Sequence, residues 1–150
     1  MEVEPTLATC LLQEALACAE RLAPAAAREP FRVLAADLEH ARISDPSLEI
    51  VGRVLELSLS SGRLRQLYGP HVEMQALRLY ERTPQGQDLL QRLAQANRSL
   101  EALSGHVLQR VQFSLHRPGS YYLTLHTDHC VVRLVIDRLG VSVESLETAG

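Results

Sequence analysis

The spacing of apolar residues changes once along the chain, near Leu108, and no other feature constrains the fold as strongly. Before this point apolar residues recur every three or four positions, which is typical of amphipathic helices; after it they alternate with polar residues, which is typical of half-buried strands. The order predicts an α+β protein, with residues 1–107 mainly helical and residues 108–147 forming a four-stranded antiparallel meander. We expect one domain over residues 1–150, because a chain of this length can bury a core without disulfides or metal ions.

Capping residues and prolines mark the limits of about five helices. Asp45-Pro46 and Thr83-Pro84 each combine a favourable N-cap residue with proline at the first helical position. Pro24 should end the first helix, because proline cannot continue a helix. We therefore expect helices over residues 6–22, 30–43, 46–59, about 70–81 and 84–107.

The expected fifth helix has the most regular apolar pattern in the chain. Six apolar residues follow at spacings of 4, 3, 4, 3 and 4, which is a heptad pattern: Leu89, Leu93, Ala96, Leu100, Leu103 and Val107. The pattern is shorter than the roughly three or four heptads that indicate a coiled coil. Two interpretations follow. Either the stripe packs on neighbouring elements of its own chain, or it binds a partner chain through Leu89, Leu93, Leu100 and Leu103.

Tight turns predict how the four strands pair. Residues 117–120 have the composition of a type II turn, and residues 127–130 and 137–140 predict two further turns. Pairing across the last turn places Arg133 opposite Glu144, and this pair of opposite charges favours the register. One face of the last three strands is then apolar and forms the expected core face: Leu123, Leu125, Val132, Leu134, Ile136, Val141 and Val143. The opposite face is mostly polar but also carries Tyr122, Val131, Val135 and Leu146.

The first strand does not fit this simple pairing. Pairing across the turn at 117–120 places Phe113 and Leu115 on the opposite, mostly polar face. Either a bulge near Pro118-Gly119 returns them to the core face, or the opposite face is covered by the N-terminal helices or by another subunit. An uncovered face would be a docking surface for another protein, formed by Phe113, Leu115, Tyr122 and Val135.

One short segment carries side chains that can bind metal ions: His126, Asp128, His129 and Cys130. Imidazole, carboxylate and thiolate groups are the usual ligands of zinc. A tight turn, however, seldom aims successive side chains at one point, and Cys130 fits the core face. We therefore expect no metal site and no catalytic residue here. A metal- or thiol-dependent activity centred on this turn is the alternative function.

All the basic residues of this chain are arginine, and there is no lysine. Either a GC-rich gene or selection against modifiable amines explains this bias. The net charge of −3 argues against nucleic acid as a partner. A second alternative function is nevertheless binding of nucleic acid or phosphate through a patch formed by Arg63, Arg65, Arg78 and Arg82.

The remaining features indicate an intracellular protein without a cofactor. The odd number of cysteines fits a reducing compartment, and Glu2 and Glu4 do not fit the start of a signal peptide. No apolar run approaches the roughly 18 residues of a membrane span, and no glycine-rich phosphate loop occurs. We expect a non-catalytic protein–protein interaction module: a cytoplasmic subunit, adaptor or scaffold that forms a homodimer or joins a hetero-complex.

Overall fold

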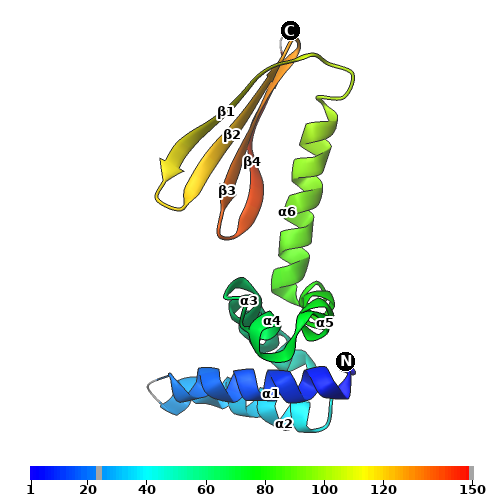
Figure 1. Ribbon diagram of the computed structural model, residues 1–150, viewed down its shortest axis with the longest axis vertical. Helices are drawn as coiled ribbons and strands as arrows, with labels where there is room; N and C mark the ends of the chain where they lie inside the picture. Colours follow the sequence, from blue (N-terminus) through cyan, green and yellow to red (C-terminus); the bar gives the residue numbers. More distant parts are fainter. Residues whose placement is uncertain (23–24, 149–150) are drawn as a thin grey trace. The chain divides into compact units, whose positions relative to one another are not determined.

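The computed structural model describes residues 1–22 and 25–148; Pro24, the predicted end of the first helix, lies outside them. Within the described residues, six α-helices precede a four-stranded antiparallel sheet, which confirms the predicted α+β class (Figure 1). The helices are α1 (Pro5–Glu20), α2 (Glu29–Glu39), α3 (Leu48–Ser60), α4 (Arg63–Tyr68), α5 (Pro70–Tyr80) and α6 (Pro84–Glu101). Short 3-10 helices lie at Ala25–Arg28 and Asp45–Ser47. The strands are β1 (Leu108–Arg117), β2 (Ser120–Thr127), β3 (Cys130–Asp137) and β4 (Gly140–Thr148).

The chain divides into two compact units, Met1–Gln87 and Asp88–Gly150. The first unit contains α1 to α5, and the second contains the sheet and most of α6. Among the described residues, no helix combines the length and the hydropathy that crossing a membrane requires.

Two helix limits differ from the predicted ones because of glycines. Gly62 at φ 70° and Gly69 at φ 87° delimit the short helix α4, which the sequence did not predict. Helix α6 ends at Glu101, before the predicted end at Val107, and Gly105 adopts φ 79° in the turns between them. The last two apolar residues of the heptad pattern, Leu103 and Val107, therefore lie outside the helix.

Of the two predicted N-caps, Thr83 is confirmed and Asp45 is wrong. Thr83 Oγ1 accepts a hydrogen bond from the backbone N–H of Gly86 at 3.2 Å, in the first turn of α6. Asp45 lies inside a 3-10 helix instead. The carboxylate that binds this turn is Asp37, from α2, which accepts hydrogen bonds from Ser44 N at 2.9 Å and Ser44 Oγ at 2.5 Å. The role of Asp37 was not predicted, because it lies seven residues before Ser44 and outside the local pattern of an N-cap.

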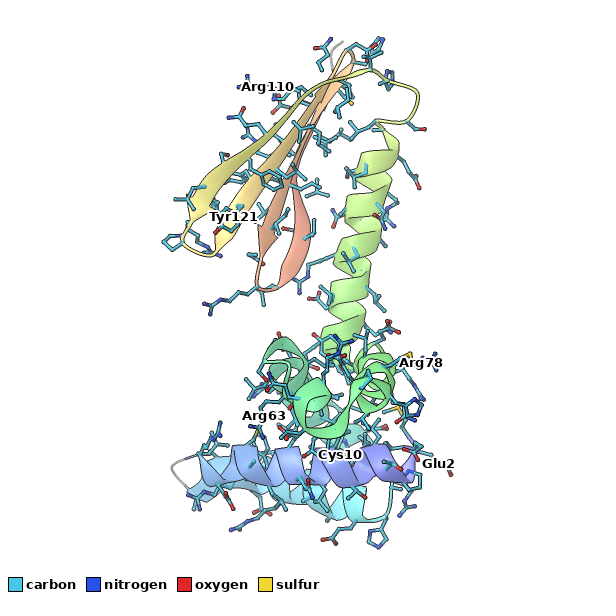
Figure 2. All side chains as sticks on the ribbon, in the orientation of Figure 1. Glu2, Cys10, Arg63, Arg78, Arg110 and Tyr121 are labelled. Carbon is cyan, nitrogen blue, oxygen red and sulfur yellow. The ribbon has the colours of Figure 1, made fainter. Side chains whose placement is uncertain are left out.

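An ion pair with a buried carboxylate connects helices of the first unit, whose core is mainly aliphatic. Glu14 of α1 is only 3% exposed, and its partner is Arg63 at the start of α4, which Figure 2 labels. Arg63 Nε and Nη2 donate to the two carboxylate oxygens at 3.0 and 3.1 Å, and Ser58 Oγ of α3 donates at 3.2 Å. The hydrogen bonds from Arg63 hold the pKa of the Glu14 carboxyl below its usual value. The pair thus ties α1 to α3 and α4.

In the second unit the strands pair in the order β1-β2-β3-β4, and a bulge decides where the first strand presents its side chains. The register of β1 on β2 shifts between Leu115 and Arg117, just before the turn. Phe113 consequently faces Leu123, and Leu115 faces Tyr121, on the core face of the sheet. Of the two predicted alternatives, the bulge is therefore the one that occurs.

A register shift between β3 and β4 makes two predictions wrong. Arg133 faces Ser145 rather than Glu144, so the predicted charge pair across the ladder does not form. Leu146 faces Val132 on the core face, not on the opposite face. The physical reason is that one extra residue in a strand reverses the alternation of side chains beyond the bulge.

Helix α6 packs on the core face of this sheet. Ala96 of the helix is buried with Val132 and Leu134 of β3. Partly buried residues from the helix end and from the neighbouring strands surround them: Leu100, Leu103, Leu123, Leu125, Val141 and Val143. The part of the apolar stripe from Ala96 to Leu103 thus packs on its own chain, as the first of the two interpretations predicts, whereas Leu93 and Val107 are exposed.

Candidate functional site

Strand β1 carries apolar side chains that lie on the core face yet remain exposed. The exposed fractions are 51% for Val111, 65% for Phe113 and 66% for Leu115. Tyr121 of β2 faces Leu115 and is 48% exposed. We call these four residues the edge strip. Figure 2 labels Tyr121 on β2 and Arg110 on the neighbouring strand.

The edge strip is exposed because α6 covers only part of the core face. The residues that α6 buries most completely, Val132 and Leu134, lie on β3, and the helix also packs against β2 and β4. All ten residues of β1, by contrast, are exposed. The sequence predicts the alternation that makes β1 amphipathic, but not that its apolar side would be left uncovered.

The residues predicted to bind a partner fall into different environments. Leu100 and Leu103 pack against the sheet of their own unit. Leu89 approaches the β3–β4 turn, where a Cβ added at Gly140 would meet its Cδ1 at 2.6 Å. Leu93 is 37% exposed. The α6 stripe is therefore mostly occupied within the chain.

The four residues predicted as a docking face on the sheet do not share one face. Tyr122 faces Val135 across β2 and β3, whereas Phe113 and Leu115 lie on the other side of the sheet. Tyr122 and Val135 are half-buried. The His116 ring lies 4.6 Å from the Tyr122 ring. The predicted surface is therefore wrong as a unit, because the bulge in β1 moves half of it to the core face.

Strand β1 is also an edge strand with a positive charge. Among the described residues it pairs only with β2, so the backbone N–H and C=O groups along its outer side have no strand partner. It contains Arg110 and Arg117 and no acidic residue, and Arg117 Nη2 lies 4.0 Å from Asp137 Oδ2 at the end of β3. Arg110 pairs with His126 on the face opposite to the edge strip. The outer edge of β1 thus presents apolar groups on one face and guanidinium groups on the other.

Only two of the four candidate metal ligands in the turn at residues 126–130, where the sequence predicts no metal site, lie in one cluster. Asp128 and His129 lie together with His106, from the segment between α6 and β1, and the donor atoms of all three lie within 4.8 Å of one another. His126 pairs with Val131 on the face opposite to the core. Cys130 is buried, with Sγ 3.3 Å from Thr127 Oγ1. His106 lies 22 residues before Asp128 and carries no local signal, so the sequence did not predict that it would join this cluster.

The predicted arginine patch is partly neutralised by carboxylates. Arg63 binds Glu14, and Arg65 Nε lies 2.9 Å from Glu73 Oε2. Arg78 and Arg82 are exposed. Two of the four guanidinium groups therefore have protein counter-ions, which leaves less charge to attract phosphate.

No known protein family, no curated protein and no solved structure matches this chain. The candidate sites therefore stand on their own geometry.

Proposed function

We propose that this protein is a non-catalytic interaction module and that the edge strip, together with the outer edge of β1, binds another protein chain. The observation that carries the proposal is that Phe113 and Leu115 lie on the core face but are about two-thirds exposed, at 65% and 66%. Large apolar side chains that continue a core without being covered are typical of protein-binding surfaces. Full burial of such a side chain by a partner would contribute about 1.5–3 kcal/mol to the free energy of binding.

The partner that fits this surface is an extended segment of a different protein, with apolar and acidic residues in alternation. Such a strand would pair with the backbone of β1 and cover the edge strip with its apolar side chains. Its carboxylates would lie on the opposite face, beside Arg110, since Arg117 already lies 4.0 Å from the carboxylate of Asp137. Pairing of β1 with β1 of a second copy fits less well, because it brings only positive charges together.

The proposal is tested by purifying the full chain gently from its host and measuring the mass and composition of the native complex. Three versions are compared: wild type, the double variant Phe113→Thr with Leu115→Thr, and the control Leu139→Thr. Leu139 is in the same unit and is 56% exposed, but it lies in the β3–β4 turn. Threonine preserves the strand preference of β1, and circular dichroism verifies that each variant is folded.

We expect wild type and the Leu139 variant to retain a stoichiometric second chain, and the double variant to lose it. If wild type is a homodimer and the double variant is a monomer, the edge strip is still the binding surface. The proposal that the partner is an acidic strand of a different protein would then be refuted. A wild-type monomer, or a complex that survives the double substitution, would refute the proposal.

A further inference from the structure

We infer that His106, Asp128 and His129 form a binding site for a divalent transition metal ion, with zinc as the best-fitting ion. The two imidazoles and the carboxylate come from two segments that lie far apart in the sequence, and their donor atoms lie within 4.8 Å of one another. Two neutral imidazoles and one carboxylate are ligands that zinc prefers, and their net negative charge complements a dication. The site does not depend on the function proposed for the edge strip.

The distances between these groups suit a metal ion. His106 Nδ1 lies 3.3 Å from Asp128 Oδ1. Ligands about 2.0–2.1 Å from a tetrahedral zinc ion are separated from one another by about 3.3–3.4 Å. The His106 and His129 rings lie 4.8 Å apart between centroids, at 59° to each other. The His106 side chain is 32% exposed, so it has room to rotate and shorten the longer distances between donor atoms, which are at most 4.8 Å.

Backbone hydrogen bonds hold the acidic ligand and its turn in place. Val107 N donates to Asp128 Oδ1 at 3.2 Å, which fixes the carboxylate beside His106. Thr127 Oγ1 accepts hydrogen bonds from His129 N at 3.3 Å and from Cys130 N at 2.9 Å. Such outer contacts orient metal ligands and raise affinity. Three protein donors leave the fourth position of a tetrahedral ion to water.

Bound zinc would link the exit of α6 to the β2–β3 turn. His106 follows the last turn of α6, and Asp128 and His129 form the turn. An ion that binds only the folded state stabilises that state, and the gain in free energy grows with the logarithm of the ratio of ion concentration to Kd. Zinc should therefore raise the melting temperature of the second unit.

The test is titration of the untagged full chain with Zn²⁺, by calorimetry and by competition with a chromophoric chelator. We expect one equivalent to bind with a Kd of about 10 µM or tighter. His106→Ala and His129→Ala should each weaken binding by about tenfold or more and abolish the rise in melting temperature. The matched control is His126→Ala, which removes an imidazole near the same turn but outside the cluster and should leave Kd unchanged. Mg²⁺ should not compete, because it prefers six oxygen ligands.

Absorption spectra with Co²⁺ separate this ligand set from one that includes Cys130. Nitrogen and oxygen ligands should give visible bands without a thiolate charge-transfer band, and Cys130→Ser should leave the spectrum unchanged. A thiolate band, or an equal loss of affinity in His126→Ala and His106→Ala, would overturn the assignment. So would a Kd for zinc weaker than about 1 mM.

Discussion

Replacing Glu14 with glutamine tests whether the buried ion pair stabilises the helical unit. The Glu14 side chain is 4% exposed, and both carboxylate oxygens accept hydrogen bonds from Arg63, at 3.0 and 3.1 Å. Ser58 Oγ and Tyr68 OH add bonds at 3.2 and 3.3 Å. Glutamine keeps the volume but removes the charge and turns one acceptor into a donor that faces the N–H groups of Arg63.

The expected loss of stability follows from these contacts. Hydrogen bonds to a charged group contribute about 1.5–3 kcal/mol, and breaking a fully buried ion pair costs about 3–5 kcal/mol. The Arg63 side chain is 41% exposed, so water can solvate it after the substitution, and the lower range applies. We expect Glu14→Gln to lower the free energy of unfolding by about 2 kcal/mol near neutral pH.

The assay is urea unfolding of the full chain, followed by circular dichroism at 222 nm. Glu20→Gln, an exposed change at the end of α1, is the control and should alter stability by less than about 0.5 kcal/mol. Because Arg63 lowers the pKa of Glu14 in the folded state, the ion pair stabilises the fold above the ordinary value of 4.5. This stabilisation is lost as the pH falls through the lowered folded-state pKa. The difference between wild type and Glu14→Gln should therefore shrink below about pH 4.5. A difference that is negligible at neutral pH, or that stays constant in acid, would refute the reasoning.

Two further predictions concern glycine and cysteine residues. Gly86→Ala should destabilise the fold by at least about 2 kcal/mol in urea unfolding, because the added Cβ would lie 1.9 Å from Tyr80 O. Gly62→Ala should cost only about 1 kcal/mol, since φ is +70° there but nothing lies within 4 Å; equal losses would contradict this. Burial raises the pKa of the half-buried Cys18 thiol, so a thiol reagent should modify it slowly in the native protein. The other two cysteines, which are buried, should react only after unfolding, and mass spectrometry of the modified protein shows the order.

Much of the fold could be predicted because it depends on neighbouring residues. The change of apolar spacing near Leu108 separates the helices from the strands, as observed. Thr83 caps α6, and Gly119 adopts φ 80° in the β1–β2 turn, as the predicted type II turn requires. These features follow from backbone preferences over three or four residues, which the sequence displays directly.

The candidate sites could be predicted less well, because each depends on residues far apart in the chain. The sequence showed that Asp128 and His129 could bind a metal ion but predicted no metal site there. The third donor, His106, lies beside them only in the folded chain. The predicted docking face contains Phe113 and Leu115, but the bulge in β1 separates them from Tyr122. A bulge needs only one extra residue and leaves no clear pattern in the sequence. It nevertheless changes which side chains share a face of the sheet.

The sequence by itself determined the α+β class, the placement of the helices before the four strands, the turns of the meander and the amphipathic character of α6 and β1. The tertiary structure alone decided the partners of these surfaces. The α6 stripe packs on its own sheet, centred on β3, and leaves the apolar side of β1 uncovered. The reason is physical: periodicity shows which side of an element is apolar, whereas the width of one helix against a four-stranded sheet decides how much of that side is covered.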